Sequence, residues 1–167
     1  MGQDIHMVLE AKIKGEWIGL CSPDHLPVLI NDKHETSWRH GFWPACSGRW
    51  YLLWYYMCGA GRWSVSMRQE KYGLPLFEPR GFPPDPSPLS HFYLIDDDYG
   101  RDEYHHASWL TLDEFMMCYQ LTRDMLHRDQ PDEFPDKQWS VWDVIGDAYG
   151  GVRYYTQDFR FVFAFDN

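Results

Sequence analysis

The stretch "DFRFVFAFDN", residues 158–167, carries a phenylalanine at every second position of its central part. The rings stand at 159, 161, 163 and 165, and the residues between them are Arg160, Val162 and Ala164. A period of two is that of a β-strand, whose successive side chains point to opposite faces of a sheet. We therefore predict a C-terminal strand with an aromatic buried face.

A second alternating stretch lies near the other end of the chain, from Gln3 to Lys12. One face would carry Ile5, Met7, Leu9 and Ala11, and the other Asp4, His6, Val8, Glu10 and Lys12. Lys14 and Gly15 then supply a turn, and "EWIGL" (16–20) can return as a hairpin partner. The pattern predicts a strand on which Asp4 and His6 are neighbours on one face.

Two helices are expected between these strands. The stretch "RWYLLWYYMCGAGRW" (49–63) is apolar around almost its whole circumference, so it is buried whether it is helix or strand. We favour a short helix that ends at the glycines 59 and 61. Thr111 and Glu114 have the spacing of a capping box, and apolar residues recur beyond them at helical spacing, which predicts a helix at about 112–127.

The remaining segments are expected to be long irregular loops. The apolar residues of 21–48 show no helical or strand periodicity, which predicts one long ordered loop or two weak elements. Residues 74–90 are rich in proline, which makes them rigid and extended. The segment "YHHAS" (104–108) would form the loop before the second helix. The fold class is then α+β, with residues 1–167 as a single globular domain and an antiparallel or mixed sheet that includes the N- and C-terminal strands.

Charge and composition exclude several classes of function. The net charge of −10 disfavours generic nucleic-acid binding, although a few converging arginines can still hold one small anion. The four cysteines form no C-x-x-C pair, no secretory signal opens the chain, and no apolar run is long enough for a membrane span. These features predict a cytoplasmic protein without a cofactor or a membrane partner, and they leave a homo-oligomer open.

Several residue groups could carry chemistry. His105, His106 and Ser108 precede a helix N-terminus, whose unpaired N–H groups can hold an anion. Metal binding by these histidines with Asp4 and His6 is an alternative, but adjacent histidines in an extended segment should point in opposite directions.

Two further patterns in the sequence bear on chemistry. The two H-x-[ST] matches, "HET" (34–36) and "HAS" (106–108), suit a two-histidine phosphoesterase but are explained by chance. Arg49, Arg62 and Arg80 lie next to aromatic or rigid segments, a combination that binds phosphate and stacks on bases. The alternative for Arg80 is a structural arginine that bonds loop carbonyls.

The motifs "MGQDIH", "GRWYLLWYYMCGAGR", "PRGFPPDPS", "HHASWLTLDE" and "VFAFDN" together resemble a family of small, mostly phage-encoded proteins. Its members typically begin Met-Gly-Cys-Asp-Ile-His, contain an R-N-Y-x-L-F element, an R-G-L-P-x-D-x-S corner and a His-Ser-x-Ser-Trp-Leu segment, and end in Phe-Asp-Asn. The resemblance marks Asp4, His6, Arg49, Tyr51, Arg80, Asp85, Ser87, His105, Ser108 and Trp109. Gln3, Trp50 and His106 depart from the family pattern. The resemblance implies a viral accessory protein, and such proteins often sequester a nucleotide-derived messenger of bacterial immunity.

We therefore expect a phage counter-defence protein that binds and sequesters a small anionic, nucleotide-derived signalling molecule. The expected ligand-binding residues are Asp4, His6, Arg49, Tyr51, Arg80, His105, Ser108 and Trp109. The first alternative is a hydrolase or phosphodiesterase that degrades such a molecule, with His6, His105 or His106 as acid or base, alone or around a metal. The second is a protein–protein inhibitor of a host factor, which the acidic run Asp96–Asp98 would serve.

Overall fold

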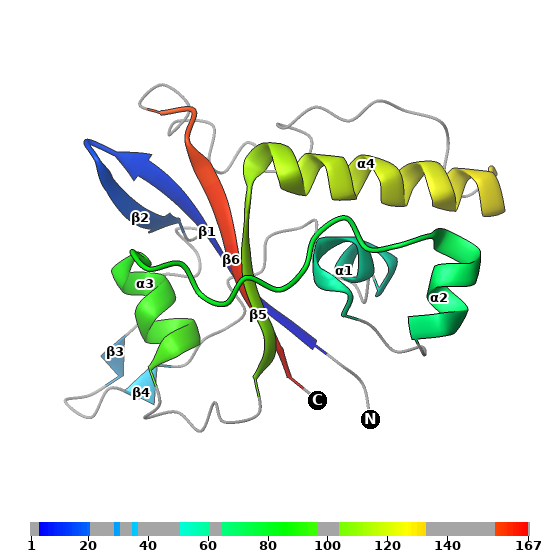
Figure 1. The fold of residues 1–167 in the computed structure, drawn as a ribbon. Coiled ribbons are helices and arrows are strands. Elements are labelled where there is room, and N and C mark those ends of the chain that lie inside the picture. The colour runs from blue at the N-terminus through cyan, green and yellow to red at the C-terminus, as the bar shows by residue number, and fades with distance from the viewer. Residues whose placement is uncertain are drawn as a thin grey trace.

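The structure, a computed structural model, contains a four-stranded antiparallel sheet with helices on both sides (Figure 1). The part of the chain that it describes comprises residues 4–20, 29–30, 35–36, 51–60, 65–96, 104–132 and 156–166. The sheet has the order β2-β1-β6-β5, made of β2 (Glu16–Leu20), β1 (Asp4–Ile13), β6 (Phe159–Asp166) and β5 (His105–Thr111). The α+β class and the antiparallel sheet confirm the prediction.

The two terminal strands lie side by side at the centre of the sheet. β1 pairs with β6 from Asp4 opposite Asp166 to Ala11 opposite Phe159. β1 also forms the expected hairpin with β2, through a turn in which Lys14 and Gly15 both have positive φ. Two left-handed residues are what a tight hairpin turn requires, because they match the twist of the strands.

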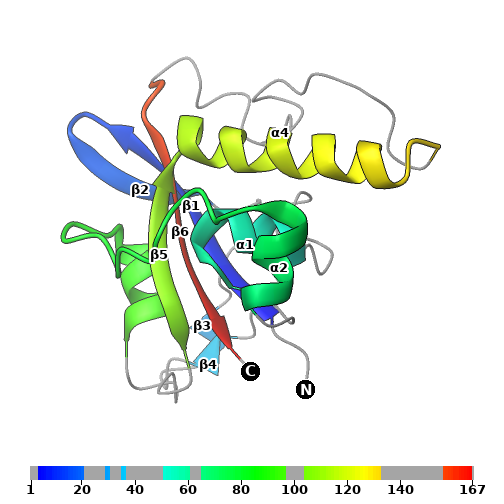
Figure 2. The ribbon, with the colours of Figure 1, turned by 45° about the vertical axis from the view of Figure 1, so that its right-hand side comes forward.

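Helices cover the sheet on two sides (Figures 1 and 2). One side, the helix face, packs against α1 (Tyr51–Cys58) and α4 (Leu112–Asp129), and α2 (Val65–Tyr72) lies beside α1. The other side, the corner face, packs against α3 (Pro88–Ser90) and a short π-helical segment, η3 (His91–Ile95). Ile5, Leu9, Phe161 and Phe163 belong to the core of the helix face, and Val8 and Val162 to that of the corner face.

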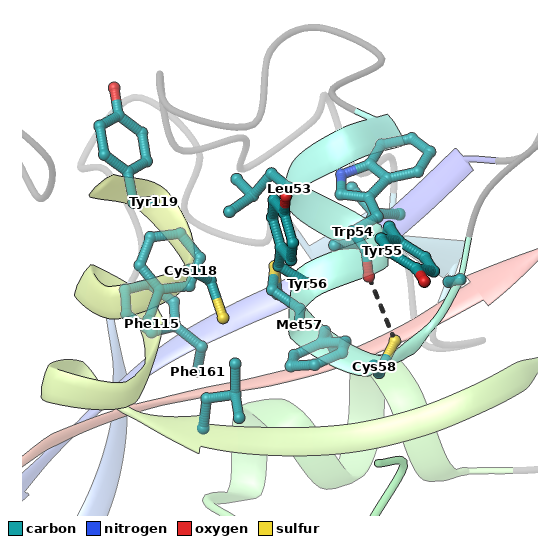
Figure 3. Close-up of a cluster of buried hydrophobic side chains, with 14 of the residues drawn as sticks. Leu53, Trp54, Tyr55, Tyr56, Met57, Cys58, Phe115, Cys118, Tyr119 and Phe161 are labelled. Carbon is teal, nitrogen blue, oxygen red and sulfur yellow. Dashed lines mark hydrogen bonds between the residues drawn. The ribbon is translucent and has the colours of Figure 1, made fainter. Parts of the chain in front are cut away.

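The core of the helix face is built from rings (Figure 3). Phe115 of α4 stacks on Phe161 of β6 with ring centroids 4.1 Å apart. α1 is buried on every side from Leu53 to Cys58, which explains why its sequence shows no polar stripe. Burial also raises the pKa of the Cys58 thiol to about 12, so this cysteine is an apolar packing group at neutral pH. The short helix favoured from the sequence is confirmed, and Gly59, with φ +78°, ends it.

The segment "YHHAS" was wrongly expected to be a loop. His105–Thr111 is a strand, β5, which pairs with β6 and continues directly into α4. The capping box is confirmed: the Thr111 hydroxyl accepts from the Glu114 amide at 3.3 Å, and the Glu114 carboxylate accepts from the Thr111 amide at 2.9 Å. The helix prediction at about 112–127 is confirmed with two more residues at its C-terminal end.

Parts of the sequence predictions fall outside the described residues. Within 21–48, the structure describes only the paired strands β3 (Leu29–Ile30) and β4 (Glu35–Thr36), which agrees with two weak elements. Arg49, Arg62, His34 and Asp97–Asp98 lie outside. In the described part of the chain, no helix combines the length and apolar character needed to cross a membrane.

Candidate functional site

A buried ion pair fixes the proline corner, residues 79–87, to the corner face of the sheet. Arg160 of β6 is 4% exposed, and its Nε donates to the Glu10 carboxylate at 2.5 Å. Its two Nη groups donate to the Asp85 carboxylate at 2.7 Å and to the Asp85 carbonyl at 2.6 Å. The Ser87 amide then donates to the second oxygen of Glu10 at 2.7 Å. The guanidinium, the two carboxylates and the amide of this cluster thus all have hydrogen-bond partners within the protein.

Packing reinforces this cluster. The ring of Trp17 lies 4.0 Å from the Arg160 guanidinium, so an aromatic face shields the cation from water. Gly19, on the same strand, allows the corner to approach closely: an added Cβ would stand 2.5 Å from the Leu89 Cβ and 2.9 Å from the Ser87 hydroxyl. Asp85 and Ser87, which the family resemblance marks, therefore hold the proline corner in place.

Arg80 is also engaged within the fold. Its guanidinium donates to both carboxylate oxygens of Glu114, at 2.9 and 2.6 Å, and lies 5.2 Å from the Trp109 ring. Its amide donates to the hydroxyl of Ser108, which is completely buried. The hydrogen bonds to Arg80 hold the pKa of Glu114 below its ordinary value. Arg80, Ser108 and Trp109 thus meet in a brace between the proline corner, β5 and α4.

His6 lies on the corner face, on the opposite side of the sheet from His105. Its Nδ1 is 3.3 Å from the Tyr93 hydroxyl, and its ring centroid is 4.9 Å from that of Tyr104. Register places it opposite Ala164 of β6, two residues after Asp4. The structure does not bring His6 and His105 together, because His105 stacks on Phe165, a residue of the helix-face core.

A β-bulge turns His105 and His106 toward each other. In β5 the register shifts between His105, opposite Phe165, and Ser108, opposite Phe163, so β5 has one more residue than β6 in this interval. His106 has φ +52°, a left-handed conformation that is uncommon outside glycine. The two Nδ1 atoms are 2.7 Å apart. The expectation that these adjacent side chains point in opposite directions was wrong, because it assumed a regular strand.

The electrostatics of the pair favour a neutral imidazole at His106. Desolvation lowers the pKa of His106, and the neighbouring charges of His105 and Arg68 lower it further. Arg68 itself is 5% exposed and donates to the carbonyls of Gly59 and Ala60 at the end of α1. A buried positive charge therefore lies near the histidine pair.

Two hydrogen-bonding groups on α1 have no partner among the residues that the structure describes. The Tyr51 hydroxyl and the Trp54 indole Nε1 are both buried, and neither makes a hydrogen bond in the described part of the chain. The two rings meet edge to face with centroids 5.1 Å apart. A buried polar group without a partner costs about 1–3 kcal/mol, so two of them on one helix need an explanation.

A series of ring contacts connects these groups with the histidine pair. Trp54 lies 5.3 Å from Phe165, Phe165 stacks on His105 at 6.3 Å, and His105 lies 4.8 Å from His106, all between centroids. This cluster, named here the ring series, comprises Tyr51, Trp54, Phe165, His105 and His106. It combines Tyr51 and His105, which the sequence indicated, with Trp54, which it did not.

Trp54 and Arg68 carried no signal in the sequence. Trp54 sits in a helix that is apolar on all sides, so nothing distinguished its indole from those of ordinary core tryptophans. Arg68 lies outside every motif of the family resemblance. Among the described residues, no group of three or more His, Cys, Asp or Glu side chains could hold a metal ion.

Comparisons with protein-family models, curated proteins and solved structures gave no match.

Proposed function

We propose that this protein binds a small anionic, nucleotide-derived molecule at the ring series and keeps it intact. The observation that carries this proposal is a pair of buried donors, the Tyr51 hydroxyl and Trp54 Nε1, which have no hydrogen-bond partner among the described residues. A ligand with acceptor oxygens would satisfy both groups and remove the cost of leaving them unpaired.

The surroundings suit an anion with a planar ring. The charge of Arg68 acts on His106, and both histidines can donate hydrogen bonds when protonated at the right nitrogen. The half-buried ring of Tyr51, which packs edge to face on Trp54, offers an aromatic surface on which a base can stack. Arg49 stands two residues before Tyr51 in the sequence and remains a predicted phosphate contact.

Arg80, Ser108 and His6 are left out of the proposed site. The Arg80 guanidinium is held by Glu114, and the Ser108 hydroxyl is buried and accepts from the Arg80 amide. Recruiting either group for a ligand would break contacts that brace the fold. His6 packs with Tyr93 and Tyr104 on the opposite side of the sheet.

The test uses two tyrosines on one helix. The purified protein is incubated with cyclic and ADP-ribose-type nucleotides, freed of unbound ligand and denatured by heat, and the released compounds are identified by mass spectrometry. Tyr51→Phe removes the unpaired hydroxyl and should weaken retention about tenfold or more. Tyr55→Phe is the matched control, because the Tyr55 hydroxyl donates to the Gly73 carbonyl at 2.7 Å and serves the fold. Equal retention by both variants, or no retained nucleotide, would refute the proposal.

The histidine pair favours a second candidate, a hydrolase acting on the same class of molecule. Two imidazole nitrogens at 2.7 Å can pass a proton between them, which suits acid–base chemistry. Turnover separates the two candidates: a sequestering protein returns its ligand intact, whereas an enzyme yields product, whose formation should cease in His105→Ala. The proposed biological role, phage counter-defence, is the same for both.

A further inference from the structure

We infer that His105 and His106 form a two-nitrogen chelate for a late first-row divalent cation such as Zn²⁺, Ni²⁺ or Cu²⁺. This inference does not rest on the proposed function, since it concerns the cation alone. It rests on the backbone of β5, which places the two imidazole Nδ1 atoms 2.7 Å apart.

The distance between the nitrogens suits shared coordination. Metal–imidazole bonds are about 2.0–2.1 Å long, so two nitrogen ligands on one ion stand roughly 3.0 Å apart at a right angle and roughly 3.4 Å apart at the tetrahedral angle of Zn²⁺. The Nδ1 atoms of His105 and His106 are 2.7 Å apart, and a small rotation of either ring reaches these spacings. Without a cation between them, one nitrogen must donate a hydrogen to the other, because two lone pairs at this distance repel each other.

The backbone fixes this arrangement in advance. Adjacent residues of a regular strand point to opposite faces, and the pair converges only because His106 is left-handed within a bulge. Stacking of His105 on Phe165 then orients one ring. A chelate whose rings are already positioned loses less entropy on binding than two free side chains.

The ligand set selects the class of cation. Imidazole nitrogen prefers Zn²⁺, Ni²⁺ and Cu²⁺, whereas Mg²⁺ prefers oxygen ligands. With two protein ligands the remaining positions on the ion stay available to water or to an oxygen of a bound anion. A Lewis-acidic ion would then stand at one end of the ring series.

The experiment measures Ni²⁺ binding to the metal-stripped, nucleotide-free protein, by competition with a chromophoric chelator. Wild type should bind one more ion per chain than His105→Ala and His106→Gly, or bind it at least tenfold more tightly. His106→Gly suits this test because glycine adopts positive φ without strain, so the bulge is kept. Circular dichroism checks that each variant folds.

Two controls make the result decisive. His91→Gln removes an exposed imidazole of η3 and should leave Ni²⁺ binding unchanged, and Mg²⁺ should not compete. The inference is overturned if both pair variants bind Ni²⁺ with wild-type stoichiometry and affinity, or if wild type binds none. Because nucleotide retention is measured separately, in chelator, failure of one proposal does not affect the other.

Discussion

A polar cluster on the corner face and two polar groups of α1 on the helix face differ in whether their hydrogen bonds are satisfied. On the corner face, Glu10, Arg160, Asp85 and Ser87 lie within one hydrogen-bonded cluster that joins residues up to 150 positions apart in sequence. On the helix face, the hydroxyl of Tyr51 and the indole nitrogen of Trp54 are buried in the described part of the chain without a partner. Buried polar groups that are all hydrogen-bonded stabilise a fold. Buried polar groups that lack a hydrogen bond in a well-packed protein indicate a functional site.

The largest effect is expected from breaking the satisfied cluster. Glu10→Ala leaves the Arg160 guanidinium buried with one carboxylate fewer, and should lower the free energy of unfolding by about 3–5 kcal/mol. Urea denaturation of the purified variant and of wild type measures this loss of unfolding free energy. Glu16→Ala, at an exposed position of the neighbouring strand, should change stability by less than about 0.5 kcal/mol. A loss below about 1 kcal/mol in Glu10→Ala would show that the cluster is not what fixes the proline corner.

A smaller change in unfolding free energy is expected when the two tyrosine hydroxyls of α1, one hydrogen-bonded and one not, are removed in turn. Tyr55→Phe removes a hydrogen bond to the Gly73 carbonyl and should cost about 0.5–1.5 kcal/mol of unfolding free energy. Tyr51→Phe removes a buried hydroxyl that has no partner in the described part of the chain, so stability should stay constant or rise. Thermal and urea unfolding of the two variants give the comparison. A loss in Tyr51→Phe as large as that in Tyr55→Phe would mean that the Tyr51 hydroxyl serves the fold.

The smallest expected effect is on how the stability of the protein changes at acidic pH. Arg80 lowers the folded-state pKa of Glu114 below its ordinary value of 4.5, so the pair stabilises the protein above that pH and the contribution is lost as pH falls through the folded pKa. Because both side chains are partly exposed, this contribution is at most about 1 kcal/mol. Unfolding curves between pH 7 and pH 3 should fall less steeply for Glu114→Gln than for wild type. If stability falls equally steeply with pH in Glu114→Gln and in wild type, the Arg80–Glu114 pair does not contribute to stability against acid.

Local patterns were enough to predict much of the fold. The alternation around Phe161 and around Leu9 predicted the two central strands, and Thr111 with Glu114 predicted where α4 begins. β5 escaped prediction because its bulge interrupts the period of two, so that the four residues 105–108 of β5 lie against the three residues 163–165 of β6.

The candidate site was less accessible to sequence reasoning. Nothing local in the chain indicates that Glu10 meets Arg160, since that contact depends on how the terminal strands pair. Whether Trp54 has a hydrogen-bond partner is likewise a property of the packed core. The sequence could mark Tyr51 and His105, but not the ring of Phe165 that connects them.

The proline corner has a consequence for the behaviour of the protein at high concentration. β5 is an outer strand of the sheet, and an open strand edge is a template on which other chains add strands and aggregate. The Gly81 amide donates to the Ala107 carbonyl at 2.9 Å, and the Arg80 guanidinium donates to the Trp109 carbonyl at 3.4 Å. Both acceptors are thereby withdrawn from an incoming chain, and the prolines that flank Arg80–Gly81 have no N–H to offer it. The segment that braces β5 to α4 thus also protects this edge from intermolecular strand addition.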